Sequence, residues 1–180
     1  MSLTATPSSG HHRARKVAVV FVVLLIPMVA GAYYYGYNTG TLTLLITDDA
    51  IAEFRSLNIT FAEVAIHSTN ALATTPWVTV KLDTTTVDLT TLSHNVTETL
   101  GLGKIPAAKY TQLRIIVESA VGTLVTGEQV AVTVPGGELR TETPFEMEPM
   151  GELTILVRLL VNHVGSTYQL QPALGSIEAT

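Results

Sequence analysis

Residues 17–37 of this 180-residue chain form a continuous stretch without a charged side chain, VAVVFVVLLIPMVAGAYYYGY. A helix of about 21 residues rises about 1.5 Å per residue, so it is about 30 Å long, like the hydrocarbon core of a bilayer. The stretch therefore predicts a membrane-inserted helix, and it constrains where the rest of the chain is located.

The residues on either side of this stretch predict its orientation in a membrane. Basic residues tend to stay on the cytoplasmic side, and aromatic rings collect at the interface between membrane and water. The interface residues predicted on this basis are Arg13, Arg15 and Lys16 before the stretch, and Tyr33, Tyr34, Tyr35 and Tyr37 at its far end. We therefore expect a single-pass cell-membrane protein with a cytoplasmic tail (1–16), a transmembrane anchor (17–37) and an extracellular domain (38–180).

The same residues also fit a cleavable signal peptide. Its usual order is a basic region, an apolar core and a few small residues before the cleavage site, here the residues that end at Ala32. Cleavage after Ala32 would release a secreted chain that begins at Tyr33. A third interpretation is a helix buried in a soluble domain. Pro27 is compatible with all three interpretations of this stretch. The anchor and the signal peptide both export residues 38–180.

The exported part of the chain is acidic. After Tyr37 the sequence has seven basic residues and all fifteen carboxylates, a net charge of −8, whereas the whole chain has a net charge of −5. Such a domain repels the phosphates of nucleic acids and the head groups of anionic lipids. We therefore expect no nucleic-acid partner.

The chain contains no cysteine, which limits the bonds that can stabilise it and the reactions that it can catalyse. This absence excludes disulfides, zinc sites made of thiolates, and cysteine nucleophiles. The exported domain must therefore be stabilised by the burial of apolar side chains and by the hydrogen bonds of its sheets.

Alternating apolar and polar residues predict that the exported domain is all-β. Leu42, Leu44 and Ile46 share one face of a strand, and the apolar phase slips by one residue at Glu63, which predicts a β-bulge there. We count eight or nine short strands with turn signals between them. This pattern favours a two-sheet Greek-key β-sandwich, with an immunoglobulin-like or a transthyretin-like strand order, after the N-terminal transmembrane or signal helix.

Glycine and proline residues give specific predictions for two further segments. Residues 91–100 have weak helical character, and the glycines at 101 and 103 then predict a helix stop and a turn. The last strand, 168–174, contains Pro172, which predicts a position at the edge of a sheet because proline donates no hydrogen bond to a neighbouring strand.

Several segments together resemble a family of archaeal and bacterial surface proteins, the domain-of-unknown-function 4382 family. The segments that carry the resemblance are 40–48 (GTLTLLITD), 58–61 (NITF) with Val64 and His67, 77–80 (WVTV), 87–89 (VDL), 105–114 (IPAAKYTQLR), 134–136 (VPG) and 168–172 (YQLQP). Ala108 stands where the family usually has glycine, and Gly136 where it often has serine. The resemblance covers residue 40 to the C-terminus and implies an exported β-sandwich domain. It implies no catalytic residue and no ligand.

Candidate sites are few. The sequons Asn58-Ile59-Thr60 and Asn95-Val96-Thr97 make Asn58 and Asn95 candidate sites of N-glycosylation in an exported domain. Asp48 and Asp49, with Glu53, have the hard oxygen ligands that calcium prefers, although no calcium-loop pattern surrounds them and a capped strand end is the simpler interpretation. The exported histidines, at 67, 94 and 163, lack the spacing of a metal site.

No pattern of a catalytic nucleophile is present, so we predict no enzymatic activity, no cofactor and no metal. Two functions remain. The first is a membrane-anchored cell-surface domain with a structural or binding role in adhesion or in the envelope, which contacts a protein or an envelope glycan. The second is a secreted filament or matrix subunit, a homo-oligomer that assembles by exchange of its N-terminal strand after cleavage near Ala32.

Overall fold

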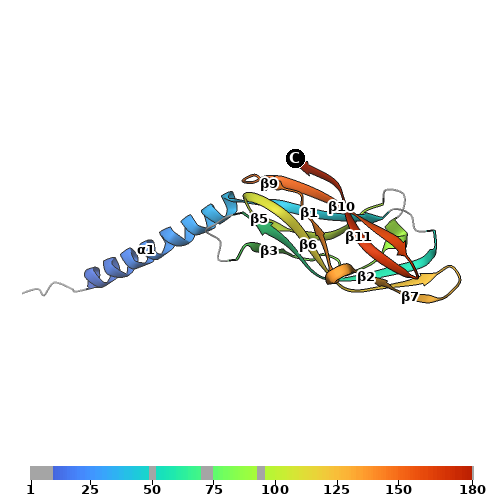
Figure 1. Ribbon diagram of the computed structural model, residues 1–180. Helices are drawn as coiled ribbons and strands as arrows, with labels where there is room; N and C mark the ends of the chain where they lie inside the picture. Colours follow the sequence, from blue (N-terminus) through green and yellow to red (C-terminus); the bar gives the residue numbers. More distant parts are fainter. Residues whose placement is uncertain (1–9, 49–51, 70–74, 93–95, 180) are drawn as a thin grey trace, which may run out of the picture. The chain divides into compact units, whose positions relative to one another are not determined.

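The computed structural model describes residues 10–48, 52–69, 75–92 and 96–179 (Figure 1). It divides the chain into two compact units, Met1–Tyr37 and Asn38–Thr180. The described residues are mostly β-strand, with one α-helix. The predicted class of an all-β domain that follows an N-terminal helix is therefore confirmed at this level.

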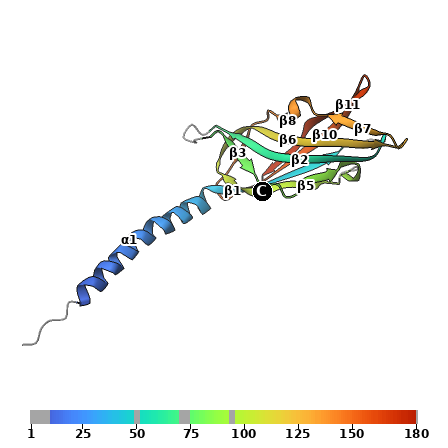
Figure 2. The same cartoon turned by 90° about the horizontal axis from the view of Figure 1, so that it is seen from below.

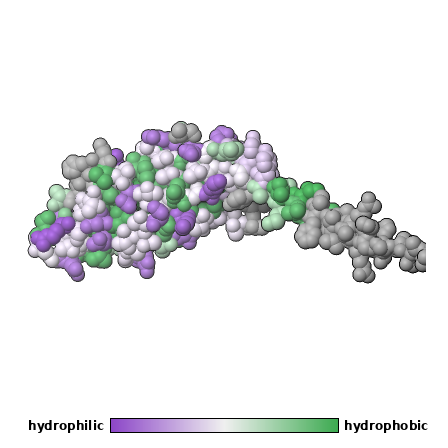
Figure 3. Space-filling view, turned by 180° about the vertical axis from the view of Figure 1, so that it is seen from behind, coloured by the Kyte–Doolittle hydropathy of each residue, from purple (hydrophilic) through white to green (hydrophobic). Residues whose placement is uncertain are grey.

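The first unit contains helix α1, Gly10–Tyr37, which includes Pro27. Its side chains are described at positions 23–34, 36 and 37, and the large apolar ones among them are exposed (Figure 3). Within the described part of the chain, no helix is both long enough and apolar enough to cross a membrane.

In the described part of the second unit there are eleven strands and two short 3₁₀ helices. The strands are β1 (Thr39–Asp48), β2 (Phe54–Ser68), β3 (Trp77–Val80), β4 (Thr86–Asp88), β5 (Glu98–Pro106), β6 (Ala108–Leu124), β7 (Gln129–Thr133), β8 (Glu138–Thr141), β9 (Phe145–Met147), β10 (Glu152–Val164) and β11 (Thr167–Ala179). The 3₁₀ helices are Leu89–Leu92 and Pro135–Gly137.

These strands form one continuous sheet in the order β3-β2-β6-β7-β11-β10-β1-β5. Strand β7 pairs antiparallel with β6 and parallel with β11, so it joins the two halves of the sheet. A single bridge between Leu82 and Gly101 links the region after β3 to β5 at the other end of this order. The result is a nearly closed, barrel-like sheet, and the predicted division into two separate sheets is not confirmed.

Strand β1 lies in the middle of one half of the sheet. It pairs parallel with β10 and antiparallel with β5. Leu42, Leu44 and Ile46 are completely buried, so the face predicted from their alternation is confirmed. Strand β10, the most apolar of the strands, buries Ile155, Val157 and other residues of the same face beside β1.

The other half of the sheet is dominated by β2 and β6, which run side by side along their length (Figure 2). Their ladder is interrupted between Phe61 and Glu63, which confirms the predicted β-bulge. Another interruption of this ladder, between His67 and Ser68, leaves Thr111 of β6 without a partner in the ladder. A bulge changes the direction of the side chains around it. The bulge at Thr111 lies beside the candidate site described below.

The predicted helix over residues 91–100 is wrong. The 3₁₀ helix ends at Leu92, and Glu98–Pro106 is strand β5. Gly101 lies within this strand. A Cβ atom at this position would lie 3.1 Å from the backbone oxygen of Lys81 and 3.3 Å from Cγ1 of Val80, so there is little room for a side chain. The glycine marks a close approach of two backbones, not a helix stop.

Strand β11 carries Pro172 in the part that the prediction placed at an edge. It pairs with β10 along its length but with β7 only at Tyr168 and Gln169. Among the described residues, Pro172 therefore has a strand partner on one side only, where it pairs with Leu159. This placement agrees with the missing N–H of proline.

Candidate binding site

The only tryptophan of the chain, Trp77, begins strand β3 on the outer face of the sheet. Val78 and Val80, which follow it, contribute to the core, and the alternation of a strand directs Trp77 and Thr79 to the opposite face. Trp77 pairs with His67 of β2. The largest aromatic side chain is therefore placed outside the core and partly exposed.

Arg114 of β6 stacks on Trp77. The guanidinium carbon lies 4.3 Å from the centroid of the indole ring, and this cation–π contact joins β6 and β3 on the two sides of β2. Ala65, the partner of Arg114 in the ladder, is completely buried, although its neighbours Val64 and Ile66 point into the core. The stacked pair therefore covers the outer face of β2 at this position.

Carboxylates flank the guanidinium of Arg114 on both sides. Its Nη2 lies 3.8 Å from Oε1 of Glu63, and its Nε lies 3.8 Å from Oε2 of Glu138. These distances allow electrostatic attraction but exceed those of hydrogen bonds. The Nε atom is buried and donates no hydrogen bond within the described part of the chain. Glu138 also accepts a hydrogen bond from Arg140, which places acidic and basic groups in alternation across β2, β6 and β8.

His67 completes this group. Its ring meets the indole of Trp77 edge to face, with 5.0 Å between the centroids. Its Nδ1 lies 3.1 Å from Oγ1 of Thr111, the residue that the bulge in β6 leaves out of the ladder. The bulge thus holds the imidazole against Trp77. We name the whole group the Trp77 patch and define it by Glu63, His67, Trp77, Arg114, Glu138 and Arg140.

An open hollow of about 410 Å³ adjoins the Trp77 patch at Thr111. Its other lining residues are Thr69, Lys109, Tyr110, Pro144, Phe145 and Glu146. Tyr110 forms the floor, where its ring stacks on Phe145 at 5.2 Å and its hydroxyl donates a 2.7 Å hydrogen bond to the carbonyl of Pro106. Burial raises the pKa of the Tyr110 hydroxyl to about 12.

The exposed rim of this hollow carries one ion pair. Nζ of Lys109 lies 3.7 Å from Oε2 of Glu146, and both side chains are more than half exposed. An ion pair in solvent contributes little to stability. Both groups are therefore accessible to a ligand that enters the hollow.

Of the two candidate glycosylation sites, the structure describes Asn58. Asn58 is exposed on β2, where it pairs with Asp88 of β4 and Val121 of β6. The hydroxyl of Thr60, which completes this sequon, lies 3.3 Å from that of Thr86. Asn95 lies outside the described residues. Glycosylation of both asparagines stays a prediction.

The predicted membrane-interface residues are described only in part. Tyr33, Tyr34 and Tyr37 are exposed on α1, and the rings of Tyr33 and Tyr37 stack at 5.9 Å. Ala32, the predicted cleavage site, is also exposed on this helix. The side chains of Arg13, Arg15, Lys16 and Tyr35 lie outside the described residues.

The structure does not bring the candidate calcium ligands together among the residues that it describes. Asp48 is buried at the end of β1, and Asp49 lies outside the described residues. Glu53 instead accepts a 3.0 Å hydrogen bond from the hydroxyl of Tyr168, which raises the pKa of that tyrosine. Over residues 10–48, 52–69, 75–92 and 96–179, no three acidic or histidine side chains are grouped as metal ligands.

The two exported histidines that the structure describes, His67 and His163, have different aromatic partners. His163 stacks on Tyr168 at 4.6 Å, and His94 lies outside the described residues. His67 takes part in the Trp77 patch through its contact with Trp77.

The sequence interpretation did not single out Trp77 or Arg114 as site residues. The signal was present, because both residues alternate with apolar neighbours that point inward, which directs a large aromatic and a cation to the outer face. The alternation could not predict that the two side chains touch, because Trp77 and Arg114 lie on strands that are separated by β2.

Comparison with known proteins places the domain in a family. A search of curated proteins finds no match. The family model described as "Domain of unknown function (DUF4382)" matches residues 39–169, a range that includes β1 and the whole Trp77 patch. Because this match covers most of the chain and agrees with the resemblance seen in the sequence, the protein belongs to the DUF4382 family.

Proposed function

We propose that this protein is a non-catalytic binding domain anchored in the cell membrane by residues 17–37, with the N-terminus in the cytoplasm and the β domain outside. One observation carries the anchor. Val23, Leu24, Leu25 and Ile26 of α1 are exposed by 61%, 64%, 53% and 63%, and these four consecutive residues lie on all sides of the helix because one turn has about 3.6 residues. A helix that is apolar on all sides requires lipid or protein around it.

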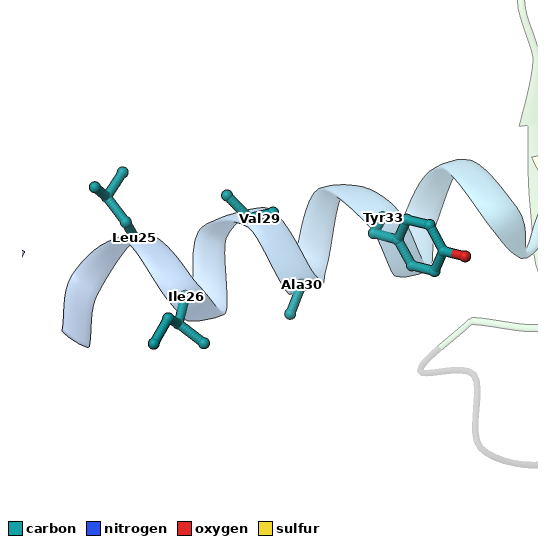
Figure 4. A pocket seen from close by; sticks show the side chains of 5 residues that line it. All are labelled: Leu25, Ile26, Val29, Ala30 and Tyr33. Atoms are coloured by element: carbon teal, nitrogen blue, oxygen red, sulfur yellow. The ribbon is translucent and has the colours of Figure 1, made fainter. Parts of the chain in front are cut away.

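The surface of α1 supports this interpretation in detail. Leu25, Ile26, Val29, Ala30 and Tyr33 line a shallow apolar groove that is formed by this helix alone (Figure 4). Leu25 and Val29 extend to one side of the helix in this view, and Ile26 to the other. Such a groove between the side chains of one helix suits the packing of acyl chains better than the binding of a polar ligand.

The binding role is supported by the Trp77 patch. Aromatic and arginine side chains are enriched at recognition surfaces, where they provide large contact areas. Here they lie on the outer face of a sheet whose inner face forms the core. The sequence contains no pattern of a nucleophile with its base, so we assign recognition and not catalysis to this surface.

The filament alternative stays a prediction. Strand β1 pairs within its own sheet, between β5 and β10, and its apolar face is completely buried. Strand exchange would therefore have to displace β1 or use residues before Thr39. No observation favours this alternative over the anchor.

The test is the state of the native protein in its own cells. We expect a full-length chain by intact-mass spectrometry, found in the membrane fraction after a carbonate wash and released by detergent. Protease added to spheroplasts should digest the β domain and spare the N-terminal tail. A variant that lacks residues 17–37 serves as the control and should leave the membrane fraction. A mature chain that begins at Tyr33 would refute the anchor.

A further inference from the structure

We infer that the Trp77 patch is a binding site for a neutral glycan, with pyranose rings against Trp77 and hydroxyls on the alternating acidic and basic groups. This inference rests on the proposed binding role of the domain, and it does not depend on the membrane anchor. It assigns to this surface a ligand class and a set of contacts.

The alternation of charge fits the chemistry of a sugar hydroxyl. Each hydroxyl both donates and accepts a hydrogen bond, whereas a carboxylate only accepts and a guanidinium only donates. Glu63 and Glu138 each lie 3.8 Å from the guanidinium of Arg114, close enough for attraction and too far for a hydrogen bond to it. Hydroxyls between them would accept from the guanidinium and donate to the carboxylates, with the added strength of hydrogen bonds to charged groups.

Arg114 is positioned for a ligand before one binds. Its guanidinium is held over Trp77. Its side chain is 23% exposed, so an acceptor oxygen of a ligand can approach it from solvent, and a hydrogen bond to a charged donor is stronger than one to a neutral donor. The Nε atom is buried, so the exposed part of the side chain is what the ligand would contact.

Trp77 supplies the apolar part of the site. A pyranose ring presents C–H groups on its faces, and these pack well against an aromatic ring, while the polar edge of the sugar reaches the flanking side chains. Trp77 is partly exposed, and His67 and Arg114 both hold its ring in place. These contacts restrain the Trp77 ring before a ligand binds, which lowers the conformational entropy that binding costs.

The charge of the surface selects for a neutral ligand. The patch contains two arginines, Arg114 and Arg140, and two glutamates, Glu63 and Glu138, so the formal charges of these four side chains cancel. The domain as a whole carries an excess of carboxylates. An acidic polymer would be repelled by the domain and would compete with Glu63 and Glu138 for Arg114.

The single tryptophan makes this inference directly measurable. Because Trp77 is the only indole in the chain, its fluorescence reports on the patch alone. We would titrate the full-length protein, in detergent micelles, with maltohexaose, cellohexaose and chitohexaose at millimolar concentrations. We expect a saturable change in the emission of Trp77 with at least one of these probes, and no saturable change with polygalacturonate.

Two variants and one control locate the ligand. Glu138→Gln removes the charge of one acceptor, and Arg114→Lys keeps the charge but loses the planar fork of donors. Each variant should weaken binding by about tenfold or more, since each weakens hydrogen bonds to a charged group. Glu118→Gln, an exposed change elsewhere on β6, should bind as the wild type does. Circular dichroism would confirm that all three are folded.

Three results would overturn the inference. The first is an unchanged Trp77 emission with all three neutral probes while the protein is folded. The second is equal binding by Glu138→Gln, Arg114→Lys and wild type, which would leave the stacked pair with only a structural role across β2. The third is saturable binding of polygalacturonate in place of the neutral probes. None of these results would affect the membrane anchor, which the fractionation tests separately.

Discussion

Tyr110 connects the stability of the fold to pH, and replacing it by phenylalanine tests that connection. Its ring is completely buried, its hydroxyl donates to Pro106, and burial raises its pKa to about 12. The ordinary pKa of tyrosine is 10.0, so the folded state keeps the proton at pH values where the unfolded chain has lost it. The unfolded state then binds fewer protons, and the stability of the wild type must fall as pH rises above 10.

The magnitude follows from these two pKa values. At pH 11 the full shift corresponds to a loss of about 1.4 kcal/mol relative to pH 8. We expect about 1 kcal/mol, because Tyr110 lines an open hollow and the solvent close to it screens part of this effect. Tyr110→Phe has no proton to lose, but it lacks the hydrogen bond to Pro106, which costs about 1 kcal/mol at every pH. The variant should therefore be less stable than the wild type at pH 8 and about as stable at pH 11.

The assay is urea unfolding of the full-length protein in detergent, followed by far-ultraviolet circular dichroism at pH 8, 10 and 11. Tyr33→Phe, an exposed change on α1, is the matched control and should follow the wild type at each pH. If the stability of Tyr110→Phe falls between pH 8 and pH 11 as much as that of the wild type, the assigned role of Tyr110 is wrong.

Three further predictions concern single residues. Gly40→Ala should cost about 1 to 3 kcal/mol of stability in thermal unfolding, because its Cβ would lie 2.7 Å from the oxygen of Gly151, whereas Gly103→Ala, with 4.0 Å of space, should cost less than Gly40→Ala. Asp88→Ala should lower the stability by about 2 kcal/mol in urea unfolding, since the Asp88 carboxylate accepts hydrogen bonds from two backbone N–H groups and a hydroxyl, and an unchanged midpoint would contradict this. Asn58→Gln should remove the mass of one glycan from the protein produced in its own cells, and an identical mass spectrum apart from the substitution would show that Asn58 is not modified.

Local patterns predicted much of the fold. The inward face of β1 and the bulge near Glu63 follow from the two-residue period of strands, because a slip of one residue would turn apolar side chains outward. Gly101 shows the limit of this reasoning. A glycine after a weakly helical segment has the same appearance whether it ends a helix or allows another backbone to approach, and only the contact with Lys81 distinguishes the two.

The sequence by itself determined that the chain has a long uncharged stretch, an acidic domain without cysteine, and strands whose apolar faces must be buried together. The tertiary structure alone decided which strands pair, including the parallel contact of β1 with β10 and the role of β7 between the two halves of the sheet. It also brought Trp77 and Arg114 into contact across β2. The reason is physical: the period of a strand depends on neighbouring residues, whereas pairing depends on residues far apart in sequence, whose relative positions arise only when the whole core is packed.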